Sequence, residues 1–93
     1  MDEERVVKLV ERLRERRVFA HVARSGVFQF GIRVVIPDGR EAVWDTDGAA
    51  GLEAQVLRDG VLVGFVPTVP GSADFDDDAV VDCIARTDYD KLS

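Results

Sequence analysis

The chain has 93 residues and a formal net charge of −6 at pH 7; 46% of its residues are hydrophobic and 32% are charged. This length suits one domain over residues 1–93, and the apolar content excludes a disordered chain. No apolar run approaches the roughly 18 residues of a membrane span, and acidic surfaces repel phosphates, so we expect neither membrane insertion nor general nucleic-acid binding.

The first predicted element is an amphipathic helix over about residues 3–16. Asp2 is placed to cap its N-terminus, and two glutamates follow in the first turn, where the helix dipole favours anions. Arginines between residues 12 and 17 crowd the C-terminal end, where cations are favoured. The apolar residues follow the helical spacing: Val6, Leu9, Val10 and Leu13.

Five strands are predicted next, over about 18–24, 27–36, 40–45, 53–58 and 61–66. Two-residue turns join three pairs of these strands: Ser25-Gly26, Asp38-Gly39 and Asp59-Gly60. Asp-Gly suits the positive φ angles of a type I′ turn, whose twist matches paired antiparallel strands. The strands are therefore expected to form an antiparallel meander.

Turns of this length also predict which residues face each other across the strands. His21 is expected opposite Phe30, and Arg33 opposite Trp44, where the two side chains could stack. One face then forms the core: Phe19, His21, Ala23, Phe28, Phe30, Ile32, Val34, Ile36 and Val43. The other face is also apolar: Val18, Ala20, Val22, Val27, Val35, Ala42 and Trp44. A single antiparallel sheet usually leaves one face polar, so either the helices divide between the faces or a second copy, in a homodimer, covers one.

A second helix closes the chain. The segment 45–51, with its small residues, predicts a loop, and the prolines and glycine of 67–73 end the last strand. Asp76 is the expected N-cap, Phe75 and Val80 are spaced as a hydrophobic staple, and the helix is expected to end near Thr87. The predicted fold class is α+β: a five-stranded antiparallel meander sheet with an N-terminal and a C-terminal helix.

The chemically reactive side chains favour structural interpretations. His21 is the only histidine and is expected to pack in the sheet, because no nucleophile or orienting carboxylate is placed beside it. Cys83 lies on the inner stripe of the second helix beside acidic residues, which oppose a reactive thiolate. A lone cysteine and an acidic N-terminus are atypical of small secreted domains, so we expect a cytoplasmic protein of bacterial type.

The acidic run before the second helix resembles a calcium loop only in part. Asp74, Asp76 and Asp78 alternate, but the sixth and twelfth positions hold Ala79 and Ala85 instead of Gly and Glu. Helix capping accounts for these carboxylates. We therefore expect no metal site, and no motif in the chain indicates a cofactor.

A small molecule, if one binds, is expected near the end of the strand 40–45. Trp44 offers a large aromatic face there, and Asp45 and Asp47 supply two carboxylates beside a glycine-containing loop. His21 and Arg33 complete this candidate lining.

The sequence favours a small acidic non-catalytic binding protein over an enzyme, because no catalytic pair, cofactor loop or metal set is present in it. Such a protein would engage a protein partner, as inhibitors, immunity proteins and adaptors do. Its acidic surface would steer it toward a basic partner. The alternative is a small-ligand-binding or enzymatic domain with a pocket near Trp44 and the 45–51 loop.

Overall fold

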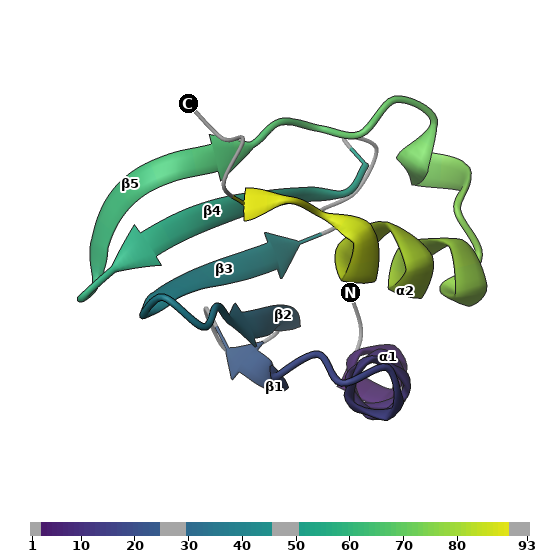
Figure 1. The fold of residues 1–93 in the computed structure, drawn as a ribbon. Coiled ribbons are helices and arrows are strands. Elements are labelled where there is room, and N and C mark those ends of the chain that lie inside the picture. The colour runs from purple at the N-terminus through teal and green to yellow at the C-terminus, as the bar shows by residue number, and fades with distance from the viewer. Residues whose placement is uncertain (1–2, 25–29, 46–50, 90–93) are drawn as a thin grey trace.

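The computed structural model of the chain describes residues 3–24, 30–45 and 51–89. It has two α-helices, a short 3-10 helix and a five-stranded sheet (Figure 1). The strands pair antiparallel in the order β1-β2-β3-β4-β5, which confirms the α+β meander. Within the described ranges, neither α-helix combines the length and the apolar content that a membrane crossing requires. In chain order the elements are α1 (Glu3–Glu15), β1 (Ala20–Arg24), β2 (Phe30–Val35), β3 (Arg40–Asp45), β4 (Glu53–Arg58), β5 (Val61–Val66), η2 (Ser72–Asp74) and α2 (Asp77–Arg86).

The end of α1 is a Schellman motif built without glycine. The N–H of Val18 donates to the carbonyl of Leu13, and the N–H of Arg17 donates to that of Arg14, both over 3.0 Å. Arg17 adopts a left-handed φ of 64° to close this motif, a conformation that costs a non-glycine residue about 1–2 kcal/mol. The chain thereby turns sharply from α1 into β1. The predicted cap Asp2 lies outside the described residues.

The caps of α2 agree with the sequence. Asp76 is the N-cap, and its Oδ1 accepts a hydrogen bond of 2.8 Å from the backbone N–H of Ala79. Thr87 is the C-cap, as expected. Phe75 and Val80, the predicted staple pair, both pack into the core.

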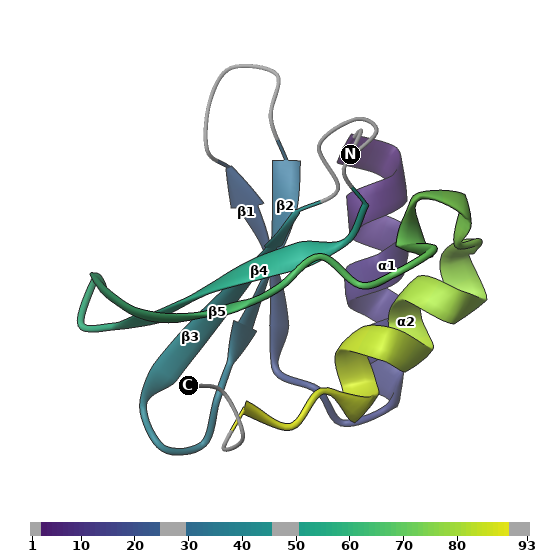
Figure 2. The same cartoon turned by 90° about the horizontal axis from the view of Figure 1, so that it is seen from above.

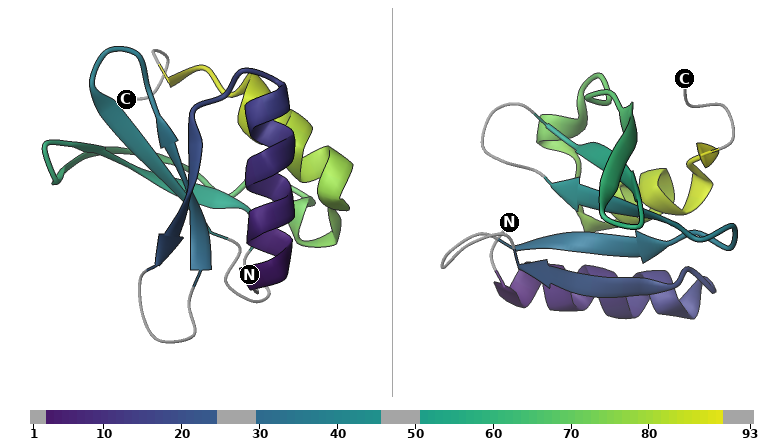
Figure 3. Two further views of the ribbon diagram at one scale, coloured as in Figure 1. Left: turned by 90° about the horizontal axis from the view of Figure 1, so that it is seen from below. Right: turned by 90° about the vertical axis from the view of Figure 1, so that its left-hand side faces the viewer.

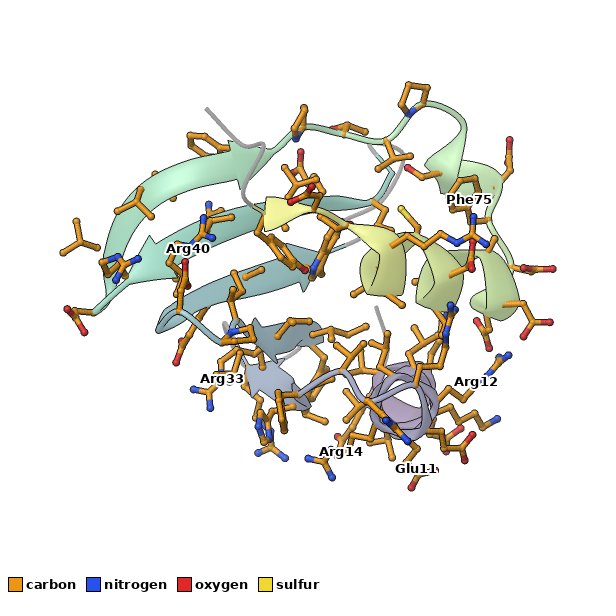
Figure 4. All side chains as sticks on the ribbon, in the orientation of Figure 1. Glu11, Arg12, Arg14, Arg33, Arg40 and Phe75 are labelled. Carbon is orange, nitrogen blue, oxygen red and sulfur yellow. The ribbon has the colours of Figure 1, made fainter. Side chains whose placement is uncertain are left out.

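Both helices lie on the same face of the sheet (Figure 2), so of the two alternatives, the division of the helices between the two faces is wrong. The segment after β5 leads the chain back over the face that α1 already covers. There α2 pairs with arginines of α1 and of the turn that follows it. Arg5 Nε lies 2.8 Å from Asp77 Oδ1, and Arg16 Nη1 lies 3.3 Å from Asp82 Oδ1. Arg12 likewise extends to Asp78 (Figure 4).

The β2–β3 turn is one residue longer than predicted. The N–H of Ile36 donates to the carbonyl of Arg40 and the N–H of Gly39 donates to that of Ile36, leaving a loop of Pro37, Asp38 and Gly39. Proline favours the second position of a type I turn, and Gly39, at φ 97°, follows it in the left-handed region. The backbone N–H of Arg40, and then its guanidinium, lower the pKa of Asp38 below its usual value.

Because of this extra residue, each side chain of β3 that the structure describes lies on the face of the sheet opposite to the predicted one. Trp44 pairs with Ile32 and Val43 pairs with Arg33. Trp44 and Ala42 therefore enter the core, whereas Val43, predicted to be a core residue, lies on the opposite face. The predicted stacking of Arg33 on Trp44 is wrong for the same reason.

The predicted pairing of β1 with β2 is also wrong. His21 pairs with Arg33 instead of Phe30, a shift of three residues, because Arg24 pairs with Phe30 and the connection spans 25–29. An odd shift exchanges the faces of a strand. Ala20 is fully buried as a result, while Phe19, His21 and Ala23 lie on the face away from the helices. The predicted Ser25-Gly26 turn, with Val27 and Phe28, lies outside the described residues.

The β4–β5 turn is confirmed. Arg58 pairs with Val61 across Asp59 and Gly60, whose φ angles of 53° and 80° are those of a type I′ turn. A bulge follows, since Leu57 pairs with Leu62 but Val56 pairs with Gly64, which leaves Val63 as the extra residue.

The core lies between the helices and the sheet. Trp44, Leu9, Leu13, Ile32, Leu52 and Ile84 are its largest fully buried side chains.

A buried serine ties the segment after β5 to this core. Ser72 Oγ accepts from the N–H of Leu52 at 2.7 Å and donates to the carbonyl of Val69 at 2.6 Å. Gly51 has a φ of 92°, and a Cβ on it would lie 2.6 Å from Ser72 Oγ, so this position requires glycine.

Candidate protein-binding face

Among the described residues, no helix covers one of the two faces of the sheet, and we name this face the open face. In the right panel of Figure 3 it is turned toward the reader. Alternation along the strands places about half of the sheet residues on it. These are Phe19, His21, Ala23, Gly31, Arg33, Val35, Glu41, Val43, Glu53, Gln55, Leu57, Leu62 and Phe65.

Large apolar side chains are exposed on the open face at both ends of the strand order. Phe19, just before β1, is 66% exposed, and on β5 Phe65 is 55% and Leu62 is 46% exposed. A shallow depression of about 500 Å³ lies on the β5 side, with Val43, Gln55 and Phe65 among its lining residues. The open face is therefore amphipathic, with apolar surface concentrated toward β5.

Polar residues of the open face lie on β1, β2, β3 and β4, and the charged and hydrogen-bonded groups of β1–β3 interact with one another and with α1. Arg33 Nη1 lies 3.7 Å from Glu41 Oε1. Arg14, from α1, donates through Nε to the carbonyl of Ala20 at 2.9 Å, and its Nη2 lies 3.2 Å from His21 Nδ1. A guanidinium can only donate, so Nδ1 is the acceptor in this contact. In Figure 4, Arg14 and Arg33 mark this polar side of the molecule.

The structure brings together two of the five predicted ligand-binding residues. His21 and Arg33 are cross-strand neighbours on the open face. Trp44 lies on the opposite face, is 0% exposed, and donates through Nε1 to the hydroxyl of Tyr89 at 3.0 Å. Asp45 is the last residue of β3, and Asp47 lies outside the described residues.

The remaining candidate groups serve the fold. Burial, and then the charge of Asp82, raise the pKa of the Cys83 thiol, which keeps it neutral. Burial likewise raises the pKa of Tyr89 and keeps its hydroxyl as the partner of Trp44. Asp76 caps α2 and Asp78 pairs with Arg12. Within the described residues, no three His, Cys, Asp or Glu side chains are grouped to hold a metal ion.

Leu62 and Phe65 on β5, which sequence reasoning did not single out, are exposed on the open face. A signal for them was present, because residues 61–66 contain no charged or polar side chain. No protein-family model, curated protein or solved structure matches this chain. The functional argument therefore depends on the geometry and charge of the open face.

Proposed function

We propose that this protein is a small non-catalytic binding module that engages a basic protein partner through its open face. The observation that carries this proposal is the exposed apolar surface toward β5. Of the seven large hydrophobic residues that are exposed among the described residues, four lie on β5, and two of these, Leu62 and Phe65, are on the open face. Contiguous apolar surface of this kind is typical of interaction sites.

The size of the open face is adequate for a modest interface. Five strands spaced about 4.8 Å apart and roughly 20 Å long give a face of about 500 Å². Each partner contributes about 800 Å² of accessible surface to a standard protein interface, and less to a transient one. Complete burial of one Leu or Phe side chain contributes about 1.5–3 kcal/mol, so a few such residues support a transient complex.

Charge favours a basic partner over a second copy. The chain carries 18 acidic and 12 basic residues, and this excess steers cationic proteins toward it. A second copy carries the same net charge of −6, which opposes self-association. The homodimer is thus the alternative occupant of the open face, and its response to salt is the reverse: added salt strengthens it.

Affinity capture from the host lysate tests this function. The baits are the wild type, Val43→Asn on the open face, and Val7→Asn on α1 as a matched control. We expect the wild type and Val7→Asn to retain the same basic proteins, which salt releases, and Val43→Asn to lose them. Equal capture by both variants, or capture that salt does not weaken, would contradict the proposal. Sedimentation of each purified protein separates a homodimer from a monomer.

The proposed setting is the cytoplasm, where a chain with the single cysteine Cys83 needs no disulfide partner.

A further inference from the structure

Within the part of the chain that the structure describes, the outer edge of the sheet at β5 lacks the usual protection of an edge strand. Figure 1 shows β5 at the end of the strand order farthest from α1. Its sequence, Val-Leu-Val-Gly-Phe-Val, contains neither charge nor proline. Among the described residues its only strand neighbour is β4. Backbone N–H and C=O groups that point outward along β5 are therefore free of any described strand partner, and they form a template for another strand.

Most side chains of β5 are exposed. Val61 is 64% exposed and Val63 is 51% exposed. Gly64 has no side chain, and a Cβ built on it would meet nothing within 4 Å. The helix-facing side of β5 is therefore uncrowded at its centre.

The bulge determines which kind of strand fits this edge. Bulges twist an edge and disfavour long, flat pairing between identical strands. Val63 interrupts the ladder, and residues 64–66 continue it regularly. This geometry suits a short extended segment better than the β5 strand of a second copy.

Carboxylates lie at both ends of β5. Glu53 lines the depression beside Phe65, and its Oε2 accepts a hydrogen bond of 2.9 Å from Thr68 Oγ1. Asp59 is in the β4–β5 turn at the other end. An incoming segment with Lys or Arg near its ends would meet these acids, whereas a second β5 strand is uncharged.

We infer that an extended, cationic segment of the partner adds to the sheet beside β5 as a sixth strand. Its backbone bonds to the outer edge of β5, its apolar side chains contact Leu62 and Phe65, and its cations meet Glu53 and Asp59. This inference rests on the proposed function and specifies how the partner is held. Strand addition supplies affinity through main-chain hydrogen bonds and specificity through alternate side chains.

Three capped synthetic hexapeptides test this inference by fluorescence anisotropy. The first alternates Lys and Val, the second alternates Glu and Val, and the third repeats the Lys-Val sequence with N-methyl groups on alternate residues. We expect the Lys-Val peptide to bind at least about tenfold more tightly than either of the others, which corresponds to about 1.4 kcal/mol. Equal binding by the N-methylated peptide, or no binding by the Lys-Val peptide, would overturn the inference.

A matched pair of variants locates the site. Val63→Lys and Val7→Lys each add one positive charge at an exposed valine, on β5 and on α1 respectively. We expect Val63→Lys to weaken Lys-Val binding about tenfold or more, and Val7→Lys to change it less than about twofold. If the two variants weakened peptide binding equally, the inference would be overturned. It would also be overturned if the wild type were a homodimer that Val63→Lys dissociates. If captured partners are lost from Val43→Asn but kept by Val63→Lys, strand addition fails and the proposed function stands.

Discussion

The two edge strands of the sheet, β1 and β5, differ in the side chains that protect them from pairing with another strand. At the β1 edge, Arg14 reaches from α1 to the carbonyl of Ala20 and to His21, and Arg24 ends the strand. The β5 edge carries only apolar side chains and glycine, most of them exposed. Charged and short edge strands resist pairing with other chains, whereas long apolar ones invite it. The difference teaches that contacts from α1 protect one edge of this sheet, whereas the other edge has, among the described residues, no strand partner beyond β4, which is the basis of the proposed strand addition.

The largest expected change in unfolding free energy comes from replacing a buried leucine near β1, in contrast to an exposed leucine on β5. Leu13 of α1, behind the β1 edge, is 0% exposed and Leu62 of β5 is 46% exposed. We expect Leu13→Ala to lower the free energy of unfolding by about 2–5 kcal/mol and Leu62→Ala to lower it by less than about 1 kcal/mol. Urea denaturation measures both. Similar losses of unfolding free energy in the two variants would contradict the difference drawn between the β1 and β5 sides.

A smaller loss of unfolding free energy is expected from a substitution in the segment that follows β5. Ser72→Ala leaves the buried N–H of Leu52 without its acceptor, and we expect a loss of about 1–3 kcal/mol in unfolding free energy. Thr87→Val is the control, because it also removes a hydroxyl, one that donates to the carbonyl of Cys83 at the end of α2. A loss at Ser72 no greater than at Thr87 would show that this anchor does not hold the β5 side to the core.

The smallest expected effect is a gain in unfolding free energy from a substitution at the end of α1, just before β1. Arg17→Gly relieves the left-handed backbone at the end of α1, and we expect it to raise the unfolding free energy by about 0.5–1 kcal/mol. Arg17→Ala removes the same charge but keeps the strained conformation, so it separates the two contributions. Equal stability of the two variants would rule out backbone strain as the cause.

Periodicity and turn chemistry predicted the elements well, because these signals are local. The strands 40–45, 53–58 and 61–66 have the predicted bounds, and the burial of Val6, Leu9, Val10 and Leu13 follows the predicted helical stripe.

Register was less predictable, because a single loop residue reverses a strand. Pro37 joins the β2–β3 loop and thereby moves Trp44 from a predicted ligand site into the core. The packing of both helices on one face was not predictable either, since ten residues between β5 and α2 permit more than one path. The candidate site depended on these two features, so only the pairing of His21 with Arg33 remains from it.

Amide hydrogen exchange of β5, with and without the Lys-Val peptide, tests the central claim most directly. If a strand adds at this edge, exchange of the outward-facing amides within residues 61–66 slows when the peptide binds, while amides of β1 are unchanged. Protection spread over the open face, or equal protection at β1, would contradict strand addition at β5.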